Sequence, residues 1–137
     1  MKRRGWKVIL FFILGMILLS PFALIYILNH GIPWMNYFIK QETVKHLHNM
    51  GHNPEAILEQ HTIAPKMSIN KDYYHTHYMV IFKDEPTVTY YYGKRKLHGS
   101  LDQFCEKDIT KDGATESTTA KAKHSENSCV SMLANRE

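Results

Sequence analysis

The sequence predicts an α+β fold, with an N-terminal transmembrane helix, one amphipathic helix packed on a small antiparallel sheet of three or four strands, and a disordered C-terminal tail. An uncharged apolar run follows a basic N-terminus, a helical pattern of apolar residues comes next, and short β-rich stretches separated by turn signals follow. We therefore expect four parts: a cytoplasmic segment 1–7, a transmembrane helix 8–28, an extracytoplasmic domain 33–105 and a disordered tail 106–137.

The apolar run has the length and composition of a membrane-spanning helix. Residues 8–28 hold no charged residue, and their strongly polar member is Ser20, next to Pro21. In a helix these residues reach about 30 Å, the thickness of the hydrocarbon core of a bilayer. Pro21 removes one backbone donor, which Ser20 can offset, so we expect a kink rather than a break.

The net charge of +4 lies in front of the apolar run and predicts its orientation. Four basic residues and no acid occupy residues 1–7, whereas basic and acidic residues balance at eight each over 8–106 and at five each over 107–137. Basic residues favour the cytoplasmic side, so we expect the N-terminus in the cytoplasm and the domain outside the cell membrane. No nucleic-acid partner is expected, because the domain has no basic excess.

A cleaved signal peptide is the competing interpretation, since a basic N-terminus suits it as well. The apolar run is longer than such a peptide requires, and no small-x-small cleavage site follows Leu28. We therefore favour an uncleaved anchor, with Trp6 and Trp34 near the two membrane interfaces.

A second helix is predicted from Pro33 to about Met50. Gly31 is placed to end the membrane helix, Pro33 to begin the next one, and Gly51 to end it. Its apolar positions recur at helical intervals: Trp34, Tyr37, Phe38, Val44, Leu47 and Met50. The first three lie close enough to the membrane to rest in the headgroup layer.

The strands are predicted from β-forming runs bounded by turn residues. Asn53-Pro54-Glu55 is typical of a short helical turn, and Asp84-Glu85-Pro86 and Gly93-Lys94 are turn signals. The expected strands are 58–64, 75–83, 87–92 and a weak one within 95–104, with the second and third forming a hairpin.

The alternation of side chains in this hairpin predicts two different faces. Tyr78, Val80 and Phe82 share one face with Val88, Tyr90 and Tyr92, and we expect these residues to pack on Val44 and Leu47 of the second helix. Met79, Ile81 and Tyr91 point to the opposite face, which is too apolar to be only a solvated surface. We therefore take Met79, Ile81 and Tyr91 as the candidate binding residues.

The tail from residue 107 has no aromatic residue and is rich in Lys, Glu, Ser, Thr and Ala. Such a composition buries too little apolar surface to offset the entropy of ordering, which predicts disorder. Cys105 and Cys129 are the two cysteines of the chain, and the sequence leaves open whether they pair.

One family is similar in the order of these features. The order of four features resembles that of the small membrane-anchored proteins of domain-of-unknown-function family 3139, from low-GC Gram-positive bacteria. The features are a basic N-terminus, an apolar span that closes near Ser20-Pro21-Phe22, a helix, and a strand running into Phe82-Lys83-Asp84-Glu85-Pro86-Thr87-Val88-Thr89-Tyr90. The resemblance covers about residues 1–98. It implies a bacterial envelope setting, and it brings no known activity and no catalytic residues.

Nine histidines are the unusual feature of the composition. His48 and His52 have a helical ligand spacing and His75 and His77 a strand spacing, so two such pairs could form a zinc site. Gly51 interrupts the first pair, however, and no Cys, Asp or Glu joins either pair at a recognisable spacing. We expect no metal, no cofactor and no catalytic residue.

These features favour a non-enzymatic membrane protein whose small extracytoplasmic module binds an envelope protein or peptide, with the bilayer as its other partner. The alternatives are a histidine-based metal-binding module and a small accessory subunit that acts through its transmembrane helix. The sequence does not indicate an oligomeric state.

Overall fold

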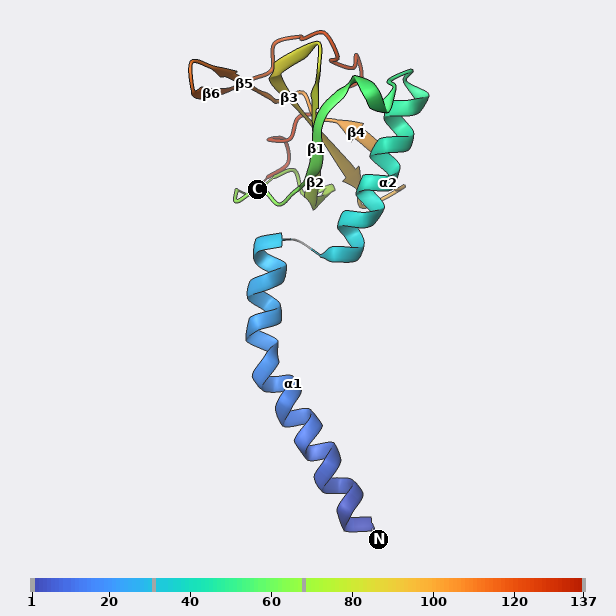
Figure 1. Ribbon diagram of the computed structural model, residues 1–137, viewed down its shortest axis with the longest axis vertical. Coiled ribbons are helices and arrows are strands. Elements are labelled where there is room, and N and C mark those ends of the chain that lie inside the picture. Colours follow the sequence, from blue (N-terminus) through green and yellow to red (C-terminus); the bar gives the residue numbers. More distant parts are fainter. Residues whose placement is uncertain (1, 31, 68, 137) are drawn as a thin grey trace.

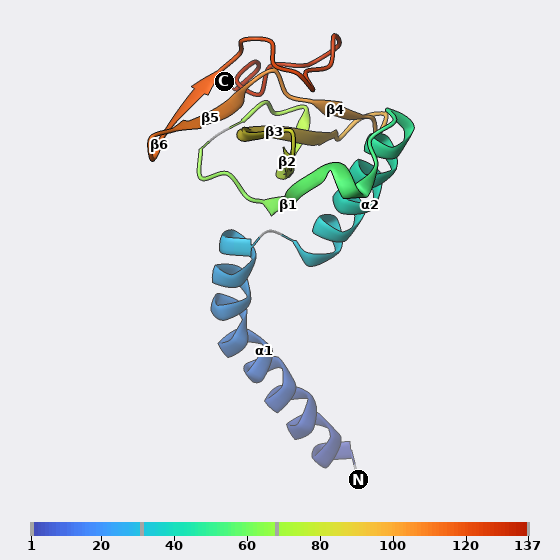
Figure 2. The same cartoon turned by 45° about the horizontal axis from the view of Figure 1, so that its top comes forward.

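A computed structural model describes residues 2–30, 32–67 and 69–136 and confirms the α+β class. A long helix, α1 (Lys2–His30), projects from a domain in which α2 (Pro33–Asn49) lies against an antiparallel sheet (Figures 1 and 2). The remaining elements are the 3-10 helix η1 (Pro54–Ala56) and the strands β1 (Ile57–Ile63), β2 (Tyr73–Phe82), β3 (Glu85–Arg95), β4 (Leu101–Gln103), β5 (Lys107–Lys111) and β6 (Ala114–Thr118).

Helix α1 carries its apolar side chains on the outside, where no other part of the described chain covers them. It continues through Pro21 without interruption, and the Ser20 hydroxyl donates to the carbonyl of Ile17 at 2.9 Å. This helix is long and apolar enough to cross a membrane.

Helix α2 has the predicted boundaries and a core face displaced from the predicted one. Pro33 is its first residue, while Gly31 lies outside the described residues. At its end Gly51 adopts a φ of 85°, and the amides of Gly51 and His52 donate to the carbonyls of His48 and Leu47. The buried residues are Ile39, Thr43 and Leu47.

Val44 was expected in the core, but it remains 36% exposed, so this part of the prediction is wrong. The helix buries positions four apart, 39, 43 and 47, and Val44 lies one residue beyond that row.

The sheet has six strands rather than three or four, in the order β1-β2-β3-β5-β6, with β4 also paired to β3. Tyr78 pairs with Tyr92 and Val80 with Tyr90 in the central hairpin, as the alternation predicted. One core cluster unites that face with the helix, and its buried members are Ile39, Leu47, Tyr78, Val80, Phe82, Val88, Tyr90 and Tyr92. The prediction of this face is therefore confirmed.

The hairpin turn predicted at Asp84-Glu85-Pro86 is displaced by one residue, and the turn predicted at Gly93-Lys94 is wrong. Phe82 pairs with Glu85, so the turn lies at Lys83 and Asp84, and Pro86 falls within β3 at a shift in register. A proline, which has no amide hydrogen, is tolerated at such an irregularity. Gly93 is not in a turn either, because β3 continues to Arg95. A Cβ at Gly93 would lie 2.3 Å from the Phe104 ring, so the glycine makes room for that ring.

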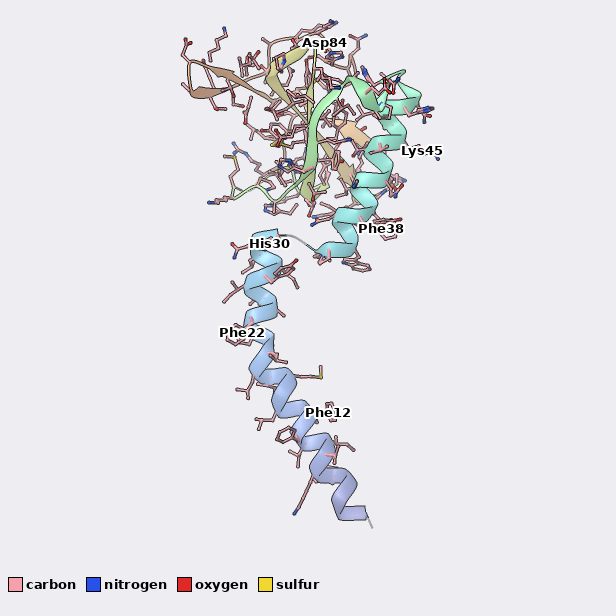
Figure 3. The ribbon with its side chains drawn as sticks, in the orientation of Figure 1. Phe12, Phe22, His30, Phe38, Lys45 and Asp84 are labelled. Carbon is pink, nitrogen blue, oxygen red and sulfur yellow. A yellow bond between two sulfur atoms is a disulfide. The ribbon has the colours of Figure 1, made fainter. Side chains whose placement is uncertain are left out.

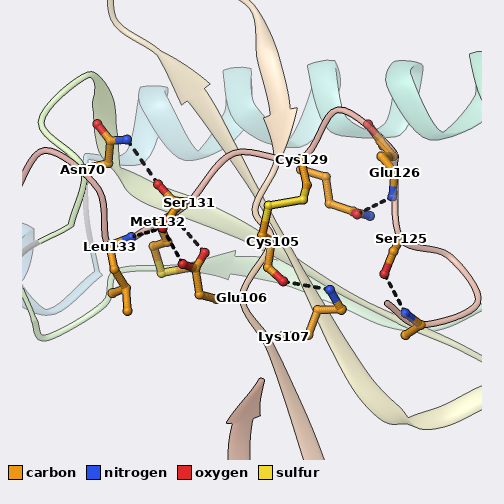
Figure 4. Close-up of a disulfide and its surroundings, with 12 residues drawn as sticks. Asn70, Cys105, Glu106, Lys107, Ser125, Glu126, Cys129, Ser131, Met132 and Leu133 are labelled. Carbon is orange, nitrogen blue, oxygen red and sulfur yellow. Dashed lines mark hydrogen bonds between the residues drawn. A yellow bond between two sulfur atoms is a disulfide. The ribbon is translucent and has the colours of Figure 1, made fainter. Parts of the chain in front are cut away.

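The prediction of a disordered tail over 106–137 is also wrong for the residues described. β5 and β6 extend the sheet, and a disulfide joins Cys105 to Cys129 (Figure 4). The Glu106 carboxylate accepts hydrogen bonds from the Ser131 hydroxyl at 2.6 Å and from the Met132 amide at 2.7 Å. Disorder was predicted because the composition of this region offers little apolar surface to bury. The region is ordered instead by these polar contacts and by the crosslink, which lowers the entropy of the unfolded chain.

Removing the disulfide should therefore loosen residues 119–136, which follow β6 and which we call the C-terminal segment. We expect the double variant Cys105→Ser/Cys129→Ser to lose about 2–4 kcal/mol of unfolding free energy, measured by urea denaturation of the full chain in detergent. Lys121 and Lys123 should then become faster trypsin sites. Addition of a reductant should destabilise the native chain and leave the double variant unchanged, and equal stability of the two proteins without reductant contradicts this role.

Candidate functional site

A pocket of about 460 Å³ lies on the face of the sheet opposite to α2. Its walls come from the end of β1 and the loop after it, from β2 and β3, from β5 with the residue before it and β6, and from the C-terminal segment. The apolar lining residues are Ile63, Pro65, Met67, Tyr91, Met132 and Leu133. Met67 and Leu133 are 59% and 42% exposed, which leaves apolar side chains at the rim.

The three predicted binding residues share this side of the sheet, and the structure separates them by environment. Met79 pairs with Tyr91 across the hairpin. Tyr91 is half-buried and lines the pocket. Met79 is 9% exposed and Ile81 is half-buried, but neither of these two residues lines the pocket. The site predicted from the sequence therefore contributes one residue to the pocket.

The C-terminal segment covers part of this second face. Ile69, Tyr73, Phe104 and Met132 form a second buried cluster, against which Tyr91 and Val130 pack. Val130 pairs with Phe104, next to the disulfide. Sequence reasoning missed Met132 and Leu133 because it assigned them to a disordered tail, and the pair of cysteines was the signal that could have identified this cover.

Tyr91 has a fixed orientation in the pocket. Its hydroxyl donates to Oδ2 of Asp108 on β5 at 2.7 Å. Burial first, and then this hydrogen bond, raise the pKa of Tyr91 above its usual value. The phenol therefore remains protonated near neutral pH, and it presents an uncharged aromatic side chain to the pocket.

His77 is the unusual polar group of this pocket. Its side chain is fully buried, its ring centroid lies 4.7 Å from that of Phe104, and neither ring nitrogen has a hydrogen-bond partner within the described chain. Burial, followed by the nearby His75, lowers the pKa of His77 to about 3, so the imidazole is neutral at neutral pH. An unpaired buried polar group costs about 1–3 kcal/mol, which a bound hydrogen-bonding group can offset.

The charged groups beside the pocket have structural roles. Glu106 accepts from Ser131 and Met132, and the ammonium of Lys107 donates to the carbonyl of Cys105 at 2.7 Å. Burial lowers the pKa of Lys107. The Glu106 contacts fasten the C-terminal segment beside the sheet, and the Lys107 contact lies next to the disulfide (Figure 4).

The two histidine pairs considered as zinc ligands do not share one environment. His48 and His75 are exposed, His77 is buried, and His52 lies beside the ring of His124 with centroids 5.1 Å apart. Over residues 2–30, 32–67 and 69–136, no group of three or more His, Cys, Asp or Glu side chains is placed to hold a metal ion.

His46 and His124 contact carboxylates instead. His46 Nε2 lies 2.7 Å from Glu126 Oε1, and His124 Nε2 lies 2.8 Å from Asp84 Oδ1. Since Glu126 and His124 belong to the C-terminal segment, these contacts fasten that segment to α2 and to the β2–β3 turn.

Comparison with known proteins yields one family. A family model described as "Protein of unknown function (DUF3139)" matches residues 3–92. The match covers α1, α2, β1, β2 and most of β3, and it ends before the C-terminal segment that closes the pocket. No curated protein and no solved structure matches the chain.

The neutral state of His77 predicts an acid-sensitive stability. Because its pKa is about 3 in the folded chain against an ordinary 6.5, the unfolded chain binds an extra proton between these values. The contribution of His77 to the unfolding free energy should therefore be fully present above pH 6.5 and fall below it, by up to about 1.4 kcal/mol per pH unit.

Urea unfolding of the full chain between neutral pH and about pH 5 tests this dependence. Asp84 stays ionised throughout that range, because its contacts with Lys123 and His124 hold its pKa at about 2. His77→Phe should reduce the acid dependence, and the exposed control His75→Phe should keep it. An identical pH dependence in both variants would show that His77 does not titrate as described.

Proposed function

This chain belongs to the DUF3139 family of proteins of unknown function, and from that premise we propose a single-pass membrane protein whose domain lies outside the cytoplasm and binds an envelope protein or peptide. The family description assigns no activity. The proposal therefore rests on α1, on the disulfide and on the pocket of this chain.

The disulfide between Cys105 and Cys129 is the observation that carries the proposed location. Disulfides form and persist in oxidising compartments and are rare in the cytoplasm. The four basic residues before the apolar run favour the same orientation, since they hold the N-terminus on the cytoplasmic side. The uncovered apolar surface of α1 supports an anchor, because lipid is the solvent that suits it.

The pocket supports the binding role. Its volume of about 460 Å³ lies within the size range of sites that enclose a small ligand, and it suits an apolar side chain of a peptide as well. Met67 and Leu133 at the rim offer apolar contact, and methionine adapts its shape to different partners. Tyr91 gives the wall a rigid aromatic surface.

We propose binding rather than catalysis for this site. Asp108 accepts a hydrogen bond from the Tyr91 hydroxyl, and Glu106 accepts hydrogen bonds from Ser131 and Met132. Lys107 donates a hydrogen bond to the carbonyl of Cys105. These groups already have partners within the chain, and they therefore support the shape of the pocket. Because the walls of the pocket are mainly apolar, a peptide with an apolar side chain is the occupant that we favour.

The location makes a prediction about topology. We expect a reporter that is active only after export to be active when fused behind Glu137, because the domain would follow α1 out of the cytoplasm. A variant with Lys2, Arg3, Arg4 and Lys7 all changed to Gln provides the comparison and should lose part of this activity. Strong activity of a cytoplasm-specific reporter at the same position contradicts the proposed orientation.

The binding role makes a prediction about crosslinking. A photoreactive amino acid at Met67, on the rim of the pocket, should give a discrete crosslinked product in native membranes. The same amino acid at Leu58, which is 55% exposed against 59% for Met67, should not. Leu133→Lys, a change at the other exposed apolar residue of the rim, should weaken the product from position 67. Equal products from both positions would assign the partner to some other surface.

A further inference from the structure

The outward face of α2 changes its chemistry along the helix. Trp34, Tyr37 and Phe38 are 65%, 60% and 53% exposed, and their spacing places them on one side. The buried row formed by Ile39 and Leu47 lies on the other side. The rings of Tyr37 and Phe38 pack edge to face, with centroids 6.2 Å apart. We call Trp34, Tyr37 and Phe38 the aromatic stripe.

The aromatic stripe is confined to the beginning of α2. Further along the same side the exposed residues are Gln41, Val44, Lys45 and His48, of which three are polar and none is aromatic. Figure 3 shows Phe38 at the end of the domain near His30, with Lys45 further along the helix. This exposed face thus carries three aromatic rings at one end and mainly polar side chains at the other, so the rings call for an environment specific to the beginning of the helix.

The position of the aromatic stripe along the chain supplies that environment. Helix α1 runs from Lys2 to His30, about 43 Å at 1.5 Å per residue, which matches a bilayer together with its headgroup layers. Trp34 follows His30 by four residues, a reach of at most about 14 Å. The side-chain amide of Asn36 also donates to the carbonyl of His30 at 2.8 Å, which keeps the two helices together.

We propose that the aromatic stripe lies in the headgroup layer of the outer leaflet, so that α2 begins on the membrane surface and leads away from it. This inference rests on the proposed anchoring by α1. Tryptophan and tyrosine prefer this layer because their rings are apolar and their N–H and O–H groups remain hydrated. Lys40, exposed one turn after Tyr37, is placed to meet lipid phosphates.

The test uses the full chain in vesicles of phosphatidylcholine and phosphatidylglycerol. Trp6→Phe leaves Trp34 as the sole tryptophan. We expect its emission to be shifted to the blue and quenched by lipids brominated near the top of their acyl chains. Emission at the wavelength of tryptophan in water, without quenching, would overturn the proposal.

A matched control moves the tryptophan to the far end of the same helix. In Trp6→Phe/Trp34→Phe/Met50→Trp the new ring replaces a side chain that is 53% exposed, sixteen residues and about 24 Å from position 34. This variant should show no quenching. Quenching equal to that of Trp34 would overturn the proposal, because the whole helix would then be in contact with lipid.

Flotation of the vesicles separates this inference from the proposed function. If the chain floats with the vesicles and Trp34 is unquenched, the anchor stands and the proposed contact of α2 is wrong. If the chain does not float, anchoring by α1 is wrong, and the proposed contact fails with it.

Discussion

The structure depends on the pairing of β2 with β3, because this pairing creates a sheet that must be covered on both faces. Tyr78, Val80 and Phe82 of β2 point to one face and are buried against α2. His77 and Met79 point to the other face and are buried as well. A two-sided apolar sheet of this size is stable only with two covers, and the chain supplies one from each end: α2 before the sheet and the C-terminal segment after it.

The first cover was readable from the sequence, and the second was not. Helical periodicity and strand alternation are local signals, and they identified α2 and the face of Tyr78, Val80 and Phe82. The second cover is built from few apolar residues held by polar contacts and a crosslink between distant positions, which a local composition argument cannot see. Pro86 and Gly93 show the same limit, since a shift in register and the Phe104 ring decide their positions in place of turn preference.

The same contrast applies to the candidate site. Tyr91 was identified because alternation determines its face, whereas Met132 and Leu133 lie in the segment assigned to the tail. His77 was weighed only as a metal ligand, since a buried neutral imidazole has no sequence signature of its own. The family match ends within β3, so the residues that complete the pocket lie outside the matched region. The family therefore describes the framework, and the further residues of this chain determine its second face.

The short connection between α1 and α2 has a consequence for recognition. Two residues separate His30 from Pro33, so a domain on a membrane anchor of this kind has little freedom to tumble. In the proposed binding role, a partner in the same membrane would meet the pocket by lateral diffusion and within a narrow range of angles. Such an encounter would lose less orientational entropy than the docking of two freely rotating proteins, so a given contact area would yield a higher affinity.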